Sequence, residues 1–547
     1  MSTNLEIESA HEKRPIQEIA RELGIDPAIV LPHGHHIAKV PVAELEHRAG
    51  DPDGALVLVT AMTPTPSGEG KTTTTIGLGD GLRRAGHRTA VCLREPSLGP
   101  YFGIKGGGTG AGHSQVVPAE DINLHFVGDM YSVSKANNLL AALVDNHLQH
   151  GNELGIDPRR ITWRRVIDLN DRALREIFVG LGGVTHGIPR KDGFNITPAS
   201  EVMAILCLAR DYRDLRDRLA RIVVGYTHGQ EPVSADMLSA EGAMTVLLRD
   251  AIHPNLVQTL HGTPAFVHGG PFANIAHGCN AITATRLALK LCDRVVTEAG
   301  FASDLGAEKF FDIKCRIGGL RPDAVVIVAT EKAIAYHGGF DEDGGTGNLL
   351  KHVENIRTFG IEPVVAVNRF PGDGVEQLRR IVDFCAAHGV RSAPYESVEK
   401  GPEGAGELAR LVDEAIEQNR ASGSFQLLYP DAVPIREKIA TVARSMYGAD
   451  GVDYDRDAEV SIDLIETIGQ GHVPVCMAKT QKSLSDSPEL RGRPRGFRVR
   501  VNEARLSAGA GFVVVICGKM LTMPGLPKEP AAVRIKVDDR GKASGLS

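Results

Sequence analysis

The sequence predicts an α/β protein with a doubly wound, mostly parallel sheet of the P-loop NTPase type and smaller additional α/β domains. Two observations lead to this class. Apolar, β-type runs alternate with periodic segments of helical length along most of the chain. A glycine-rich turn follows the first long apolar run, as a phosphate-binding loop would. Ligands of such sheets bind beyond the carboxyl ends of the strands, so we expect the functional residues there.

The predicted elements follow from these periodicities. The apolar strand-like runs cover residues 56–61, 89–95, 221–226, 294–300, 324–330 and 363–370. Segments with helical periodicity lie between several of them, for example 137–150 and 273–292. Because helical segments separate the strands, the connections favour parallel pairing.

The length of 547 residues exceeds one hydrophobic core, so several domains are expected. We predict a nucleotide-binding domain over 1–360, an α/β domain over 361–450 and a small C-terminal domain over 451–547. After about residue 450 the segments are shorter and more strand-rich, at 458–468, 473–479, 496–518 and 531–537. Residues 400–406 are expected to form an exposed loop.

Composition excludes several classes of protein. The net charge of −7 argues against a general nucleic-acid binder, which needs a basic face. The chain has no apolar run near the ~18–20 residues that span a bilayer, and its first twenty residues lack the apolar core of a signal peptide. We therefore expect a cytoplasmic protein without nucleic-acid or membrane partners. The eight cysteines are scattered, which favours reduced, buried thiols.

The segment TPTPSGEGKTTTT, residues 63–75, is the candidate phosphate site. It joins an apolar strand to a stretch that can be helical, whose first turn would offer free backbone N–H groups to a phosphate. Lys71 can reach the terminal phosphates, and the hydroxyl of Thr72 or Thr73 can hold Mg²⁺. The pattern is imperfect because Thr65 stands where a P-loop has its first glycine. A purely structural turn is the alternative. The predicted ATP-binding residues are Thr65, Pro66, Ser67, Gly68, Glu69, Gly70, Lys71, Thr72 and Thr73.

A second cluster begins where the run 89–95 ends. Arg94 at this position could neutralise a phosphoryl group or clamp a carboxylate, although a surface salt bridge is the alternative. The following KGGGTGAG, residues 105–112 with Gly106 among its glycines, allows a backbone to approach a ligand closely. Carboxylates near a phosphate site usually serve a cation, and the next segment supplies Glu120, Asp121 and Asp129, together with His125.

A third cluster, VHGGPFANIAHGCN at 267–280, contains His268, Asn274 and His277 near the start of a predicted helix. The two histidines are nine residues apart, which does not match a helical metal pair at i, i+4. Helix capping combined with packing is therefore an equally good explanation of this cluster.

Taken together, TPTPSGEGKTTTT, FGIKGGGTGAGHSQVVPAEDINLHFVGD and VHGGPFANIAHGCN resemble the motifs of the formate–tetrahydrofolate ligase family. The resemblance runs from about residue 15 to the C-terminus, and the length fits the monofunctional bacterial form. It implies that ATP and formate give formyl phosphate, whose carbonyl is attacked by N10 of tetrahydrofolate to form 10-formyltetrahydrofolate. Substrates would be formate and tetrahydrofolate, with or without additional glutamates, and the family implies a homotetramer.

The resemblance also implies roles for individual residues. Lys71 and Arg94 would be catalytic, with Arg94 holding formyl phosphate, and residues 1–360 would carry this chemistry. Residues 361–450 would contribute to the folate site. Mg²⁺ would sit at Thr72, and a monovalent cation, K⁺ or NH4⁺, at Glu95 and Asp129. The residues expected to border the folate are Phe301, Phe370, Pro371 and Val398, the last standing where the family has a tryptophan.

Two other functions fit the same motifs. A regulatory P-loop ATPase would couple its nucleotide state to a partner and hydrolyse ATP without regard to formate or tetrahydrofolate. A ligase for another small carboxylate would differ only in its acid substrate.

Overall fold

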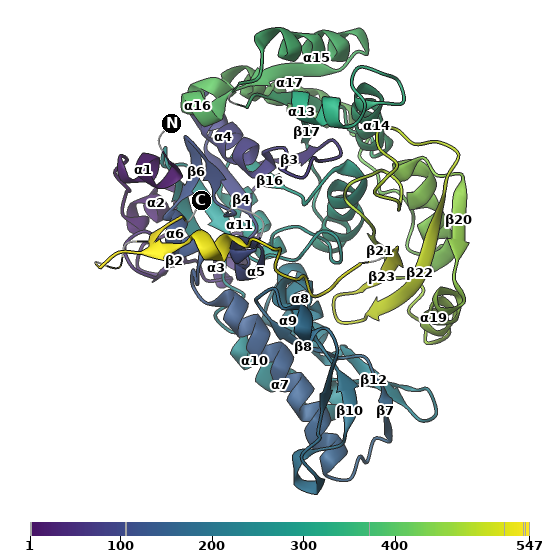
Figure 1. Cartoon of the computed structure of the whole chain (residues 1–547). Coiled ribbons are helices and arrows are strands. Elements are labelled where there is room, and N and C mark those ends of the chain that lie inside the picture. Colours follow the sequence, from purple (N-terminus) through teal and green to yellow (C-terminus); the bar gives the residue numbers. More distant parts are fainter. Residues whose placement is uncertain are drawn as a thin grey trace.

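The computed structural model describes residues 3–103, 107–370, 372–518, 520–539, 541 and 543–545. The predicted folate residue Pro371 and the glycine Gly106 lie outside the described residues. The fold is organised around one large sheet, from which an arm and a separate small sheet extend on different sides (Figure 1).

The central sheet has twelve strands and is mostly parallel, which confirms the predicted α/β class. Short antiparallel strands, including β14 (Asn255–Thr259), extend one side of it. The parallel strands lie in the spatial order β15 (Pro264–Val267), β4 (Thr89–Leu93), β16 (Arg294–Glu298), β3 (Ala55–Ala61), β17 (Ala324–Ala329), β18 (Val364–Asn368) and β19 (Arg391–Tyr395).

The position of β16 decides where the site forms. This strand pairs in parallel with β4 on one side and with β3 on the other, although both neighbours come about two hundred residues earlier in the chain. The pairing sets Glu298 opposite Val59 of β3 and Thr297 opposite Cys92 of β4. The carboxyl ends of β4, β16 and β3 therefore lie side by side.

Both faces of the sheet are covered, because side chains alternate along each strand. Val57 and Val59 of β3 join the apolar cluster that includes α4 (Lys71–Arg84) and α17 (Gly406–Ser422). Leu56 and Leu58 of the same strand join the larger cluster with α11 (Ile282–Leu291) and α14 (Gly345–Thr358) on the other face. This arrangement is the doubly wound pattern that the sequence predicted.

Helix α4 packs unusually close to its neighbours because it contains three spaced glycines. A Cβ atom on Gly77 would lie 2.1 Å from the hydroxyl of Tyr395, and one on Gly79 would lie 2.4 Å from Cγ2 of Val91. At Gly81 the nearest atom would be Cβ of Ala405, at 2.9 Å. Glycine weakens an isolated helix by roughly 0.5–1 kcal/mol per residue relative to alanine. The surrounding strands and helices must therefore hold α4 in place.

The arm consists of α7 (Asp129–Gln149), α10 (Glu241–Leu247) and several short strands, and it projects away from the central sheet (Figure 1). The predicted strand at 221–226 is β12 (Val223–Thr227), which pairs with β7 (Ile156–Ile161) and β13 (Pro232–Ser234) in the arm. Its expected place in the parallel sheet was wrong, because its partners are antiparallel neighbours.

The C-terminal part forms a four-stranded sheet in the order β20 (Gly451–Tyr454), β22 (Arg498–Ser507), β23 (Phe512–Cys517) and β21 (Val475–Ala478). The expectation of strand at 458–468 was wrong, because this segment lies in α19 (Arg456–Thr467). Its apolar residues Ala458, Ile462 and Ile465 recur with helical spacing and are buried. The segment 531–537 likewise contains a 3-10 turn, Ala531–Arg534, before the short strand Lys536–Val537.

Two further expectations need correction. The helix expected over 273–292 begins only at Ile282, and the residues before it form irregular backbone around Gly278, whose φ is +66°. Residues 401–405 are not an exposed loop but the 3-10 helix η7, where Gly401 and Ala405 are buried and Ala405 faces α4. In the part of the chain that the structure describes, no helix is long and apolar enough to cross a membrane.

Candidate active site at the ends of β4, β16 and β3

The loop between β3 and α4 has the backbone conformation that a phosphate cradle requires. Gly68 and Gly70 have φ values of +80° and +78°, a region that side chains disfavour. A Cβ on Gly70 would also lie 2.6 Å from Nδ2 of Asn368, at the end of β18. Helix α4 begins at Lys71, so its first backbone N–H groups point into the space beyond the loop. Pro66 and Ser67 form the exposed tip of the loop.

Glu69 supports this loop from its inner side. Its buried carboxylate accepts a hydrogen bond from the backbone N–H of Thr65 at 2.6 Å and another from the hydroxyl of Thr330. The carbonyl oxygen of Glu69 accepts a third bond from Nδ2 of Asn368, at 3.0 Å. One bond within the loop and two from other parts of the chain, at Thr330 and Asn368, therefore hold the loop in one conformation.

Glu298 joins the phosphate loop to the next strand ends. Its Oε2 accepts a hydrogen bond of 2.8 Å from the hydroxyl of Thr72, in the first turn of α4. Its Oε1 lies 3.4 Å from Nη2 of Arg94, which follows β4. The Glu298 side chain is only 4% exposed, whereas that of Arg94 is 25% exposed. One buried carboxylate thus touches two residues that the sequence predicted to handle phosphate.

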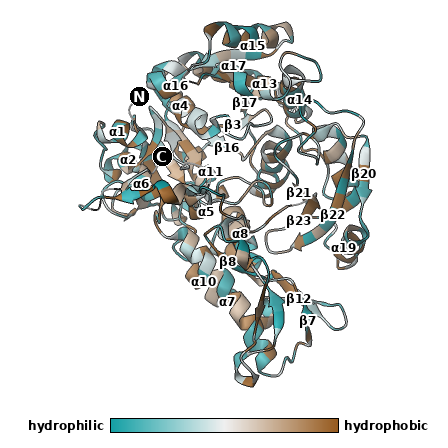
Figure 2. Cartoon of the chain, viewed as in Figure 1, coloured by the Kyte–Doolittle hydropathy of each residue, from teal (hydrophilic) through white to brown (hydrophobic). Residues whose placement is uncertain are grey.

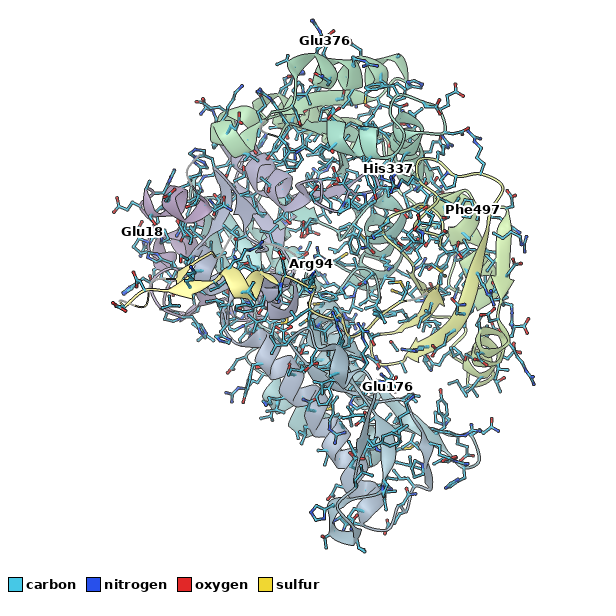
Figure 3. All side chains as sticks on the ribbon, viewed as in Figure 1. Glu18, Arg94, Glu176, His337, Glu376 and Phe497 are labelled. Carbon is cyan, nitrogen blue, oxygen red and sulfur yellow. The ribbon has the colours of Figure 1, made fainter. Side chains whose placement is uncertain are left out.

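Arg94 lies near the centre of the molecule, whereas Glu176 marks the arm (Figure 3). Its surroundings are tight: a Cβ on Gly300 would lie 3.0 Å from Nη1 of Arg94 and 2.3 Å from Cβ of Ala273. Among the described residues, the buried Nε of Arg94 has no hydrogen-bond partner. The guanidinium therefore lies close to Gly300, and its Nε is a donor without a bonded acceptor in the described part of the chain.

Asp129, at the first position of α7, is already paired with a cation from the protein. Nζ of Lys39 lies 2.8 Å from its Oδ1 and 3.0 Å from its Oδ2. Nδ2 of Asn255 also donates to Oδ2 at 2.8 Å, and Oδ1 of Asn255 accepts from Lys39 at 2.7 Å. All three side chains are buried. The group is a closed network in which each charge has a partner.

Glu95 lies beside this network but is not part of its hydrogen bonds. Burial raises the pKa of its carboxyl well above the ordinary value, and the nearby negative charge of Asp129 raises it further. Its Oε2 is buried without a hydrogen-bond partner among the described residues. The structure thus places the predicted pair Glu95 and Asp129 in one neighbourhood, with a vacant acceptor on Glu95 only.

The described residues expected around the folate, Phe301, Phe370 and Val398, lie on three separate segments of the chain. Phe301 follows Gly300 with a φ of +61°, which is rare for an aromatic residue and is typical of strained functional backbone. Cζ of Phe370 would be 3.9 Å from a Cβ on Gly70, and its ring lies 4.7 Å from Nζ of Lys332. Val398, in α16 (Ser397–Lys400), accepts a backbone hydrogen bond from His113 at 3.0 Å.

The glycine-rich segment and Val398 pack against each other. A Cβ on Gly112 would lie 2.7 Å from Cγ1 of Val398, so only glycine fits at this contact. Asn123 holds the same segment from the other side, accepting from the backbone N–H of Gly108 at 2.8 Å and donating to the hydroxyl of Thr109 at 3.0 Å. The described part of this segment is therefore anchored between two neighbours.

The third motif supports the site without supplying exposed ligands. His268 and His277 are fully buried, and burial lowers the pKa of His268 to about 4 and that of His277 to about 3. Nε2 of His268 bonds the carbonyl oxygen of Ala251 at 2.7 Å. Ala273, between these histidines, lies against Gly300, as Arg94 does. Among the described residues, Nδ1 of His268 and both ring nitrogens of His277 have no hydrogen-bond partner.

Two residues of this region were not singled out by the sequence. Glu298 ends a predicted strand, and an acidic residue at such an end was the available signal. Lys39 gave no signal, because it lies in the two-residue strand β2 (Ala38–Lys39), ninety positions before Asp129. Among the residues that the structure describes, no group of three or more His, Cys, Asp or Glu side chains is arranged to hold a metal ion.

The arrangement suits a nucleotide and a hard cation. The backbone N–H groups of the loop with its positive-φ glycines and of the first turn of α4 can donate hydrogen bonds to phosphate oxygens. The hydroxyl of Thr72 and the carboxylate of Glu298 are oxygen ligands of the kind that Mg²⁺ prefers. Cationic side chains, Lys71 and Arg94, follow β3 and β4 at the same edge of the sheet. This geometry can position a phosphoryl group and neutralise its charge.

Comparison with known proteins assigns the family. The family model for formate--tetrahydrofolate ligase matches residues 2–547. A protein of Paracoccus denitrificans (strain Pd 1222), named formate--tetrahydrofolate ligase, is 53% identical over 557 aligned residues, which cover 100% of this chain and 100% of the relative. Both matches span the phosphate loop, Arg94 and the C-terminal sheet. The chain therefore belongs to the formate–tetrahydrofolate ligase family.

Proposed function

We propose that the chain catalyses the ATP-dependent ligation of formate to tetrahydrofolate, giving 10-formyltetrahydrofolate, ADP and phosphate through formyl phosphate. Family membership supports the overall reaction. The observation that carries the assignment of residues is the convergence of the phosphate loop, Glu298 and Arg94 at adjacent strand ends. We assign the sheet to the P-loop NTPase type because its cradle joins β3 to the first turn of α4.

In the first step a formate oxygen attacks the γ-phosphorus of ATP, and the bond from this phosphorus to the β,γ-bridging oxygen breaks. The reaction needs little covalent help from the protein, so positioning and charge neutralisation account for most of the catalysis. The loop from Thr65 to Thr73 holds the phosphates, and Lys71 neutralises the terminal one. Arg94 holds the formyl phosphate oxygens. The hydroxyl of Thr72 would hold Mg²⁺, which would supply further charge neutralisation.

In the second step N10 of tetrahydrofolate attacks the formyl carbon, and the carbon–oxygen bond to phosphate breaks. The departing phosphate can accept the proton that N10 loses. Phe301, Phe370, Pro371 and Val398 line the folate site in this proposal. The closeness of Phe370 to Gly70 supports it, because the pterin must approach the phosphate loop for transfer to occur.

A monovalent cation, K⁺ or NH4⁺, binds near Glu95 and Asp129. Because Asp129 is already bonded by Lys39 and Asn255, the vacant oxygen of Glu95 is the better ligand. An ion that binds only the native protein stabilises it by mass action. Potassium or ammonium chloride should therefore raise the melting temperature and turnover above those in sodium or lithium chloride. Equal values in all four salts at one ionic strength would contradict this site.

The assembly is a homotetramer in which the three predicted parts, 1–360, 361–450 and 451–547, are repeated four times. The first boundary falls between β17 and β18, which are neighbours in one sheet. The arm supports association, because the large apolar side chains of Phe178 and Val184 are 70% and 89% exposed there. Figure 2 shows hydrophilic and hydrophobic residues side by side along the arm. Sedimentation of the purified chain tests the tetramer.

The decisive experiment is formation of 10-formyltetrahydrofolate, read after acid conversion to the methenyl form, with and without formate. We expect product only when ATP, formate and tetrahydrofolate are all present. Acetate should not replace formate, which separates the proposal from a ligase for another small carboxylate. ATP hydrolysis that is indifferent to formate and tetrahydrofolate would instead indicate a regulatory ATPase.

A further inference from the structure

We propose that Glu298 is a positioning residue that makes the site selective for the magnesium complex of ATP over free ATP. This inference deepens the proposed function and rests on it for the identity of the nucleotide. In the structure Glu298 orients the Thr72 hydroxyl and holds Arg94 beside the phosphate loop. When the nucleotide binds, the hydroxyl stays oriented toward the cation and Arg94 turns to the phosphoryl oxygens.

The charge of Glu298 disfavours a nucleotide without its metal. Glu298 is a buried carboxylate next to a loop built for anionic phosphates. A negative charge so close to a second one is unfavourable in a weakly hydrated site unless a cation lies between them. A divalent cation bound to the nucleotide removes this repulsion, whereas free ATP increases it. The carboxylate therefore penalises the nucleotide that arrives without its metal.

The two contacts of Glu298, with Thr72 and with Arg94, differ in length and exposure. The Thr72 hydroxyl donates to Glu298 at 2.8 Å, a normal hydrogen bond, whereas the contact from Arg94 is 3.4 Å long. Arg94 is also the more exposed partner, at 25% against 4%. The hydroxyl contact is thus the firm one, and the guanidinium can leave with little loss because solvent or phosphate oxygens can replace the carboxylate.

The position of Glu298 in the sheet allows it to contact both neighbours. Glu298 is the last residue of β16, and β16 lies between β4 and β3. Gly300, two residues later, has no room for a side chain because Arg94 and Ala273 lie against it. The strand pairing and this close packing fix the carboxylate midway between the phosphate loop and Arg94.

The test compares nucleotide affinity with and without metal by isothermal titration calorimetry, using ATP in excess MgCl2 and ATP in EDTA, without formate or tetrahydrofolate. Wild-type protein should bind the magnesium complex more tightly. Glu298→Gln should reduce the ratio of the two dissociation constants about tenfold or more, since residues that orient metal ligands typically affect metal affinity by about 10–100-fold. Much of the change should come from tighter binding of free ATP.

Glu201→Gln is the matched control. Glu201 is also a buried glutamate, but its carboxylate accepts from the backbone N–H groups of Gly509 and Ala510 instead of touching the phosphate loop. Its substitution should leave the ratio unchanged. Glu298→Asp, which keeps the charge but shortens the side chain, should retain the penalty on free ATP while losing the contact with Thr72. It should therefore keep more metal selectivity than Glu298→Gln.

An unchanged ratio in folded Glu298→Gln, checked by its melting temperature, would overturn the inference. Failure of the proposed function is a separate result, because it would appear as absence of 10-formyltetrahydrofolate from wild-type protein whatever the nucleotide affinities. A reduced ratio without ligase activity would support the role of Glu298 and reject the reaction.

Discussion

Asp129 and Glu298 are both buried carboxylates beside the candidate site, but their surroundings differ. Lys39 and Asn255 make four hydrogen bonds with Asp129 and with each other, and all three side chains are shielded from water. Glu298 has one firm bond to a hydroxyl and one long contact to a partly exposed guanidinium. The first network is closed, whereas the second can exchange partners.

This difference distinguishes charges that stabilise the fold from charges that can interact with substrates. A buried charge whose partners are all internal is costly to disturb, because removing one partner leaves the other uncompensated. A charge with an accessible partner can change that partner when a ligand binds. Position next to the glycine-rich motifs does not separate the two cases, since both carboxylates lie near them. The two cases are separated by whether every partner in the hydrogen-bond network is internal.

The largest expected effect concerns the closed network. Lys39→Met removes the only cation that bonds Asp129 among the described residues, and breaking such a buried pair typically costs about 3–5 kcal/mol. The free energy of unfolding, measured with urea, should fall by that amount. Adding Asp129→Asn should restore part of it, because the uncompensated charge disappears. Equal stability of Lys39→Met and wild type would show that the network is not closed.

Substitutions at the phosphate loop and beside Glu298 should have the opposite effect: they should lower activity and leave stability unchanged. Lys71→Ala and Arg94→Ala should each nearly abolish ligation, since losing one preorganised charge or donor costs about 10²–10³-fold in rate. Their melting temperatures should stay close to that of wild type, because both side chains are proposed to serve ligands. Initial rates of 10-formyltetrahydrofolate formation provide the measurement. Near-normal turnover of Arg94→Ala would remove this arginine from the site.

Asp80 sharpens the comparison, because it is buried with hydrogen bonds but, among the residues that the structure describes, without a bonded cation. Its Oδ1 accepts from the hydroxyls of Thr259 and Thr263 at 2.7 and 2.6 Å, and burial raises its pKa from 3.8 to about 7. Between these values the folded protein keeps the proton that the unfolded chain loses, so stability falls as pH rises.

Asp80→Asn should remove this decrease of stability with rising pH. The stability of the variant relative to wild type should increase by up to about 1.4 kcal/mol per pH unit between pH 4 and 7, and then level off. Urea unfolding at pH 5, 6, 7 and 8 measures it. A difference between variant and wild type that is independent of pH would show that Asp80 is ionised in the folded protein at all of these values.

The smallest expected effect lies at the folate side of the open region. Val398→Trp adds an aromatic face, and such contacts contribute roughly 0.5–1.5 kcal/mol beyond the area they bury. The Michaelis constant for tetrahydrofolate should fall by up to about tenfold, since ~1.4 kcal/mol corresponds to a factor of ten. Those for ATP and formate should hardly change. Because Val398 packs against Gly112, a rise in the folate constant would indicate that the indole displaces the glycine-rich segment instead.

Local sequence patterns predicted the parts of the molecule that depend on nearby residues. The strand before Thr63, the turn through Gly70 and the helix from Lys71 follow from apolar runs and glycine positions within about thirty residues. The order of strands in space does not follow from such patterns. The insertion of β16 between β4 and β3 depends on long-range pairing, so Glu298 could not be placed beside Thr72 and Arg94 from sequence alone.

The sequence also predicted strand where the structure has a helix, in a segment with one buried face. Residues 458–468 contain isoleucine and valine, which favour strands, but the spacing of the buried positions is helical. Lys39 illustrates a different limit: a lysine in a two-residue strand looks like a surface residue until the fold brings Asp129 and Asn255 to it. Tertiary contacts decide both cases.

The three glycines of α4 have a consequence for how the protein is made. A glycine-rich helix is unstable by itself. Besides Ser114, the surfaces that confine Gly77 and Gly81 are those of Tyr395, Ser397 and Ala405. These surfaces are synthesised more than three hundred residues after the helix. During translation, the phosphate loop therefore emerges early but acquires its rigid support late. A nascent chain that stops before residue 390 contains the whole nucleotide motif and yet lacks the packing that gives the motif its shape.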